Sequence, residues 1–266
     1  MKKIPPTPNN TKSAPAPDSK PASDTTPKPK FKLNWRTVGW VALMLLWVGA
    51  ALFACQFVIS FILVLALDYE TISQPVWGTI FSALSFSLCL AIVIFVPSKL
   101  AKTKTTREEL GLTGLPTWTD IGLAPVGFVV HLVLSMILLA VFMAVLPSIN
   151  WEQAQDVGFQ NLFSVGDRLL AFAALVIIAP IAEEIIFRGW LYGKLRVKIP
   201  AWLSILLVSA LFGLMHGQWN VGINVFCMSV VACLLREITG TIWSGILLHM
   251  LKNAVAFYFL FVNPIL

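Results

Sequence analysis

Long runs of apolar residues alternate with short polar segments from about residue 37 onward. Because an α-helix rises about 1.5 Å per residue, a run of about 20 apolar residues can cross the hydrocarbon core of a bilayer. The strands of an outer-membrane barrel would instead alternate apolar and polar positions over about ten residues. The pattern therefore predicts an all-α, polytopic transmembrane bundle of about seven spans (six to eight). The expected spans are 37–67, 76–97, 120–146, 168–194, 201–217, 221–236 and 241–262, of which the fifth and sixth are short.

Residues 1–34 differ from the rest of the chain, because they are rich in Pro, Lys, Ser and Thr and contain almost no large apolar side chain. A segment of this composition cannot bury enough apolar surface to offset the conformational entropy that is lost on ordering. We therefore expect a disordered tail over residues 1–34 and one transmembrane helical domain over residues 35–266.

The composition argues against an ordinary soluble domain and against a nucleic-acid-binding protein. Of the 266 residues, 58% are hydrophobic and 12% are charged, and the mean hydropathy is +0.82. An ordinary soluble domain is about 25% charged. The net charge of +6 does not indicate nucleic-acid binding, because the basic residues cluster beside apolar spans and form no stripe with interleaved aromatics. The four cysteines lie in apolar segments without metal-binding spacing, and we expect them to pack.

The basic residues gather in alternate loops, which is the pattern that sets the orientation of a membrane protein. They precede the first span and follow the second and the fourth, whereas the other loops carry mainly acidic residues. We therefore expect the N-terminus and the 98–118 loop to be cytoplasmic. The basic residues concerned are Lys28, Lys30, Lys32, Arg36, Lys99, Lys102, Lys104, Arg107, Lys194, Arg196 and Lys198.

Three polar clusters interrupt the predicted spans. An ionisable side chain in the bilayer core costs about 2.5 kcal/mol or more, so such residues are expected to have a function. Glutamate and histidine activate water, and hydrogen-bond donors stabilise an oxyanion. The leading hypothesis from the residues is therefore hydrolysis within the membrane. The clusters are Glu183-Glu184-Ile-Ile-Phe-Arg188, Phe212-Gly-Leu-Met-His216 and His249-Met-Leu-Lys-Asn253.

The first two clusters have a predictable geometry. Glu184 and Arg188 are four residues apart and share a helix face, where they can pair. Glu183 projects about 100° away from Glu184, toward a partner helix. Glu183 and His216 are equidistant from Pro200, a credible turn between the fourth and fifth spans, so they should lie at the same depth. A structural role is the alternative: the ion pair would then only fix helix packing.

The third cluster has two possible donors on one helix face, His249 and Asn253, which could bind an oxyanion or bridge helices. A turn near Gly240 would put His249 only about 14 Å along its helix, shallower than His216 unless the preceding hairpin protrudes. Lys252 could either line the site or extend toward the membrane surface. Phe212 should pack behind the pocket, and His131 is expected to form a hydrogen bond between helices.

These motifs, EEIIFR, FGLMH and HMLKN in that order, resemble those of the CAAX prenyl protease and bacteriocin-processing (CPBP, Abi-type) family of intramembrane proteases. The runs Leu235–Trp243 and Glu109–Thr113 also resemble segments of this family. The resemblance covers roughly residues 107–260, and the first two spans are not diagnostic.

The resemblance implies a helical membrane endopeptidase whose protease core covers about residues 107–262. Glu183 and His216 would activate a water, and His249 and Asn253 would stabilise the oxyanion. Glu184 and Arg188 would support these groups. The substrate would be a membrane-associated protein or peptide, and the eukaryotic branch of the family cuts prenylated CAAX-type tails. The protein would be integral to a bacterial-type cell membrane.

Two mechanisms stay open at this point. In one, no metal takes part and Glu183 is the general base. In the other, Glu183, His216 and His249 bind zinc and leave a coordination position open. We favour the metal-free version, because no pair of histidines at i and i+4 occupies one helix and Asn253 is a poor zinc ligand.

Two other classes of function compete with the protease. One is a non-catalytic membrane scaffold or bacteriocin-immunity protein that keeps the same fold. The other is a proton-coupled transporter with Glu and His at the midplane, disfavoured because the chain shows no internal repeat. The substrate, its cleavage site and the oligomeric state are not predicted by the sequence.

Overall fold

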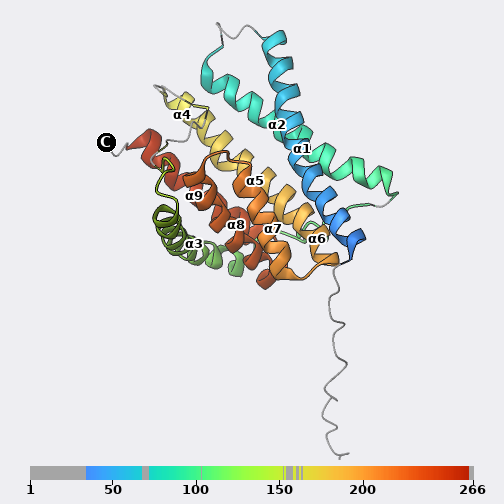
Figure 1. The fold of residues 1–266 in the computed structure, drawn as a ribbon. Helices are drawn as coiled ribbons and strands as arrows, with labels where there is room; N and C mark the ends of the chain where they lie inside the picture. The colour runs from blue at the N-terminus through green and yellow to red at the C-terminus, as the bar shows by residue number, and fades with distance from the viewer. Residues whose placement is uncertain are drawn as a thin grey trace, which may run out of the picture. The chain divides into compact units, whose positions relative to one another are not determined.

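The computed structural model describes residues 34–67, 72–102, 104–151, 153, 158–159, 162 and 164–263. All regular structure in these residues is helical, which confirms the all-α prediction (Figure 1). The tail expected over residues 1–34 lies outside the described residues except for Asn34, and its disorder stays a prediction.

Seven helical stretches of the described chain correspond to the seven predicted spans. Six are long and apolar enough to cross a membrane, and α7, with 14 residues, is shorter. The sixth predicted span was wrongly taken as short, because it was ended at the charge of Arg236. Helix α8 continues for 21 residues to Gly240, whose positive φ of 73° terminates it. The stretches are α1 Trp35–Ala66, α2 Gln74–Leu100, α3 Trp118–Val145, a continuous helix Val165–Lys198, α7 Ala201–Leu214, α8 Trp219–Thr239 and α9 with η3, Trp243–Val262.

The arrangement of the helices leaves the Val165–Lys198 helix between two groups. Helices α1 and α2 pack on one another and against this helix, whereas α3 packs on α8 and α9. Figure 1 accordingly shows the α1–α2 pair and α3 on opposite sides of the other helices. The turn predicted at Pro200 is confirmed, because Pro200 is the N-cap of α7 and follows directly on the end of the long helix.

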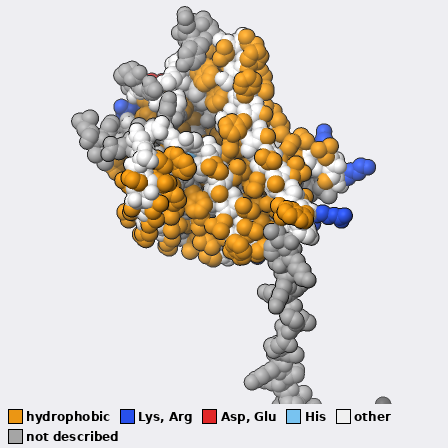
Figure 2. All heavy atoms as spheres, in the orientation of Figure 1, with side chains coloured by type: hydrophobic (Ala, Val, Ile, Leu, Met, Phe, Trp, Pro, Cys, Tyr) orange, Lys and Arg blue, Asp and Glu red, His pale blue; other side chains and the backbone are white. Residues whose placement is uncertain are grey.

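The outward faces of the helices are apolar. Leu46 is 70% exposed, Phe57 is 74% exposed and Met136 is 64% exposed. In Figure 2, hydrophobic side chains cover most of the described face, and the Lys and Arg side chains lie at its edges. Large apolar side chains turned outward around several long helices are typical of contact with lipid. The protein is therefore an integral membrane protein.

The Val165–Lys198 helix contains two π-helical segments, in which the backbone hydrogen bonds are wider than in an α-helix. Wide π-helical turns are rare and occur often at functional sites. Here two of them flank the short α-helical segment that carries Glu183 and Glu184. The segments are α4 Val165–Phe172, η1 Ala173–Ile178, α5 Ala179–Glu184, η2 Ile185–Tyr192 and α6 Gly193–Lys198.

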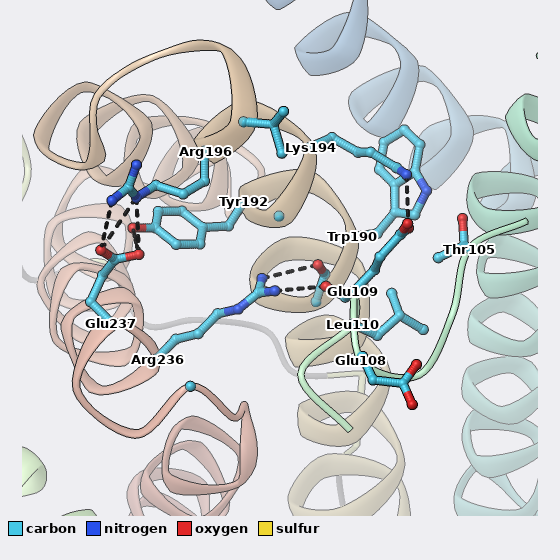
Figure 3. A pocket seen from close by; sticks show the side chains of 14 residues that line it. Thr105, Glu108, Glu109, Leu110, Trp190, Tyr192, Lys194, Arg196, Arg236 and Glu237 are labelled. Atoms are coloured by element: carbon cyan, nitrogen blue, oxygen red, sulfur yellow. Dashed lines mark hydrogen bonds and ion pairs between the residues drawn. The ribbon is translucent and has the colours of Figure 1, made fainter. Parts of the chain in front are cut away.

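The runs Glu109–Thr113 and Leu235–Trp243, which resemble segments of the protease family, lie side by side. The guanidinium of Arg236 donates to the carbonyl of Gly189 at 3.0 Å and to the carbonyl of Glu109 at 2.7 Å (Figure 3). The backbone N–H of Ile242 also donates to the carbonyl of Gly111 at 3.1 Å. The segment before α3 is thereby fastened to the α8–α9 turn.

This fastening resolves the expected mismatch in depth. Glu237, near the end of α8, accepts a hydrogen bond from the Tyr192 hydroxyl at 2.9 Å, so the α8–α9 turn lies near the level of Tyr192. Glu183 precedes Tyr192 by about the same number of residues as His249 follows Gly240, and both are about 14 Å from that level. The α6–α7 hairpin therefore extends past the α8–α9 turn, and the side chains of Glu183 and His249 reach equal depth.

Candidate active site

A cavity of about 400 Å³ lies between the Val165–Lys198 helix, the end of α7 and α9. Four residues expected to be catalytic line it: Glu183, His216, His249 and Asn253. The prediction that Glu183 and His216 share a depth is thus supported by their common cavity. Lys252 also lines this cavity, which agrees with the first of the two alternatives expected for it.

Glu184 and Arg188 lie behind the cavity and are fully buried. The Arg188 Nε lies 3.2 Å from Glu184 Oε2, which confirms the pair expected from their spacing. The other carboxylate oxygen of Glu184 lies 3.0 Å from His249 Nδ1. Glu184 therefore connects Arg188 to His249, a contact between residues 65 apart in the chain. Gly245, one turn before His249, gives the carboxylate room, since a Cβ there would come within 3.0 Å of Glu184 Oε2.

The hydrogen bonds of the two histidines define which nitrogen faces the cavity. Glu184 pairs with Arg188 and is a carboxylate, which can only accept, so His249 donates through Nδ1. His216 likewise donates through Nδ1 to the carbonyl of Phe212 at 2.8 Å. In the neutral imidazole the Nε2 atom of each ring then carries a lone pair. His249 Nε2 lies 3.8 Å from Glu183 Oε2, whose side chain is 19% exposed.

Phe212 packs among the charged and polar groups. Its ring makes edge-on contacts with His216, at 5.0 Å between centroids, and with His249, at 5.9 Å. The Arg188 guanidinium lies 4.4 Å from the centroid of the same ring, a distance at which a cation is attracted to the aromatic face. Phe212 was expected to pack behind the pocket, but it lines the cavity itself and its ring contacts both histidines and Arg188.

Asn253 satisfies a backbone carbonyl that a proline leaves without a donor. In an α-helix the carbonyl of Leu175 would accept from the N–H of Ala179, but this N–H donates to Ala174 instead. The donor in the π-helical register would be residue 180, and Pro180 has no N–H. The side-chain amide of Asn253 donates to Leu175 at 2.8 Å. One of its two N–H bonds is thus used within the protein.

This arrangement predicts a coupling between Asn253 and Pro180. Asn253→Ala should leave the Leu175 carbonyl unsatisfied and lower the free energy of unfolding by about 1 kcal/mol. In a Pro180→Ala background the new N–H can bond to Leu175, and the same Asn253→Ala change should cost less. A double-mutant cycle measured by unfolding in mixed micelles checks this. Equal costs in both backgrounds would contradict the proposed carbonyl cap.

The first two helices contribute residues that the sequence did not indicate. Gln56 from α1 and Ser82 from α2 line the cavity, although these spans carry no diagnostic motif.

His131 was expected to bond to another helix, but its Nδ1 lies 3.2 Å from the Ser135 hydroxyl within α3. Its Nε2 is buried without a hydrogen-bond partner among the described residues. Only the i, i+3 spacing of Lys252 from His249 was a usable signal for a further cavity residue.

The zinc alternative can be tested against the donor set. Histidines that donate through Nδ1 and present Nε2 are of the type that binds metals. However, within the described part of the chain no three His, Cys, Asp or Glu side chains lie close enough together to hold a metal ion. Glu183, His216 and His249 therefore have suitable chemistry but do not form an assembled ligand set.

Comparisons with known proteins point to the same segment. Residues 165–255 match the family described as Type II CAAX prenyl endopeptidase Rce1-like, and this range contains all three motifs. The chain is similar to "Putative membrane peptidase YdiL" of Bacillus subtilis (strain 168), with 26% identity over 185 residues, 68% of this chain and 70% of that relative. No solved structure matches. The matches confirm the expected resemblance of this chain to the CAAX prenyl protease and bacteriocin-processing family of membrane proteases.

Proposed function

We propose that this protein is an intramembrane endopeptidase that hydrolyses a peptide bond of a membrane-associated protein or peptide. Prenylated, CAAX-type tails are one substrate class that this resemblance suggests. The observation that carries the proposal is the cavity itself, which is lined by Glu183, His216 and His249 beside a fully buried Glu184–Arg188 pair.

In the proposed step, Glu183 accepts a proton from a water while the water oxygen bonds to the peptide carbonyl carbon. The carbonyl π electrons move onto oxygen and give a tetrahedral oxyanion. His216 accepts a hydrogen bond from the second O–H of the water through Nε2, which orients the nucleophile while that hydrogen stays on the water oxygen. When the oxyanion collapses, the C–N bond breaks and Glu183 returns its proton to the leaving amine.

The role of His249 follows from its contacts. Glu184 holds the ring with Nε2 toward Glu183, so neutral His249 is an acceptor that can position the water. It donates to the oxyanion only when protonated. Asn253 donates to the oxyanion through its second side-chain N–H, the one that does not bond to the Leu175 carbonyl. Arg188 pairs with Glu184 and holds its side chain in place.

Purified protein in proteoliposomes tests the proposal with a library of membrane peptides that includes prenylated and unmodified members. We expect cleavage that persists in the presence of a zinc chelator. Cleavage lost to the chelator and restored by zinc would instead give Glu183, His216 and His249 roles as ligands. No cleavage of any peptide, with or without zinc, would contradict the proposal and favour the non-catalytic scaffold.

A further inference from the structure

The cavity has few free donors for the negative charge that peptide hydrolysis creates. His249 donates through Nδ1 to Glu184 and presents an acceptor to the cavity in its neutral form. Asn253 has one N–H engaged by Leu175. An oxyanion in a site of low dielectric constant is stabilised chiefly by donors that are already in place. A further hydrogen-bond donor that carries a positive charge is therefore needed beside Asn253.

Lys252 meets this need. It lines the cavity one helical turn from His249 and directly before Asn253. Glu183, His216 and His249 line the same cavity as Lys252. Lys252 nevertheless makes no direct ion pair or hydrogen bond to any residue that the structure describes, and its three N–H bonds are available to a ligand.

The position of Lys252 along its helix argues against a role as a surface anchor. Trp243 and Val262 bound the span, and Lys252 lies near the middle, about 14 Å of helix from either end. A lysine side chain is too short to carry its ammonium over that distance. A cation at such depth is costly unless it has a partner or a function. The carboxylate of Glu183 lowers this cost without engaging the ammonium directly.

We propose that Lys252 is a further catalytic residue, whose ammonium binds the oxyanion of the tetrahedral intermediate beside Asn253. This role rests on the proposed endopeptidase activity. The carbonyl oxygen would lie between the second N–H of Asn253 and the ammonium, while the water approaches from the side of Glu183. The residues that activate water and the residues that hold the oxyanion would then come from different helices.

Three variants test this assignment in the proteoliposome assay. Lys252→Met keeps the length of the side chain and removes its charge, whereas Lys252→Arg keeps the charge. Lys198→Met removes an exposed cation at the end of α6, away from the cavity, and serves as the matched control. We expect kcat to fall about 10²-fold in Lys252→Met with little change in KM. Lys252→Arg should recover part of the loss, and Lys198→Met should behave like the wild type.

A different result would identify a substrate carboxylate as the anion that Lys252 binds. The assay therefore compares each peptide with a free and an amidated C-terminus. A rise in KM for the free acids alone, with kcat unchanged, would overturn the oxyanion role and make Lys252 an anchor. Unchanged kcat and KM in Lys252→Met would overturn any role in binding an anion, while cleavage by the wild type would still support the endopeptidase.

Binding of a phosphonopeptide, whose anionic oxygens mimic the tetrahedral intermediate, gives a readout that does not depend on turnover. Stabilisation of the wild type against thermal unfolding, at least tenfold weaker affinity in Lys252→Met and unchanged affinity in Lys198→Met would support the proposal. Equal binding by wild type and Lys252→Met, or no binding by either, would overturn it. A protein that binds the phosphonopeptide through Lys252 but cleaves nothing would contradict only the endopeptidase.

Discussion

Glu183→Gln should retain the fold and lose cleavage by about 10²–10⁴-fold, the contribution expected of a general base. The substitution preserves the size of the side chain and its ability to accept a hydrogen bond, but it removes the basic oxygen that takes the proton from water. Glu183 makes no short ion pair among the described residues, since its contact with a basic side chain is with His249 Nε2, at 3.8 Å. Its loss should therefore disturb folding little. The measurement is initial cleavage rate in proteoliposomes, together with thermal unfolding of each purified protein.

Glu108→Gln provides the matched control, because this carboxylate is exposed and lies outside the cavity. It should cleave at the rate of the wild type. Full activity in Glu183→Gln would remove this residue from the mechanism and leave His216 or His249 as the base. A Glu183→Gln protein that unfolds far more easily than the wild type would show that the side chain has a structural role.

Glu184→Gln should have the largest effect on stability, about 3–5 kcal/mol in the free energy of unfolding. Both side chains of the Glu184–Arg188 pair are fully buried, and removal of one charge leaves the other uncompensated in a medium of low dielectric constant. The guanidinium N–H groups have no hydrogen-bond partner among the described residues, and the ring of Phe212 replaces only a small part of the lost attraction. Reversible unfolding in mixed micelles measures the loss.

The double variant Glu184→Gln, Arg188→Met separates charge from packing. It removes both buried charges and should recover most of the stability lost in the single variant, because an apolar replacement of a buried pair is often neutral. Cleavage should stay low in the double variant, since His249 no longer faces a carboxylate. If the double variant were as unstable as Glu184→Gln alone, the cost would come from lost packing and not from the unpaired arginine.

Several features of the fold are local and could be read from the sequence. The long helices follow from apolar runs, and the turn at Pro200 follows from the missing N–H of proline. The Glu184–Arg188 pair follows from a four-residue spacing that places two side chains on one helix face. The end of helix α8 could not be predicted in this way, because the charge of Arg236 is accommodated by the carbonyls of Gly189 and Glu109 on other segments.

The contacts that organise the cavity are not local. His249 donates to Glu184 because the α8–α9 turn is fastened at the level of Tyr192, and no spacing within either motif encodes that level. Asn253 bonds to Leu175 because Pro180 leaves a carbonyl without a donor on a different helix. The walls supplied by Gln56 and Ser82 come from helices without any recognisable motif.

The sequence by itself determined the all-α membrane fold, and it drew attention to the three polar motifs that line the cavity. Hydrophobic periodicity and side-chain type suffice for these, because a bilayer admits few ways to satisfy a polypeptide backbone. Only the tertiary structure decided how the motifs meet: which nitrogen of each histidine faces the cavity, which N–H of Asn253 stays free, and that the Lys252 ammonium is unengaged beside Glu183. These depend on the depth and rotation of one helix against another, which packing across the whole bundle sets.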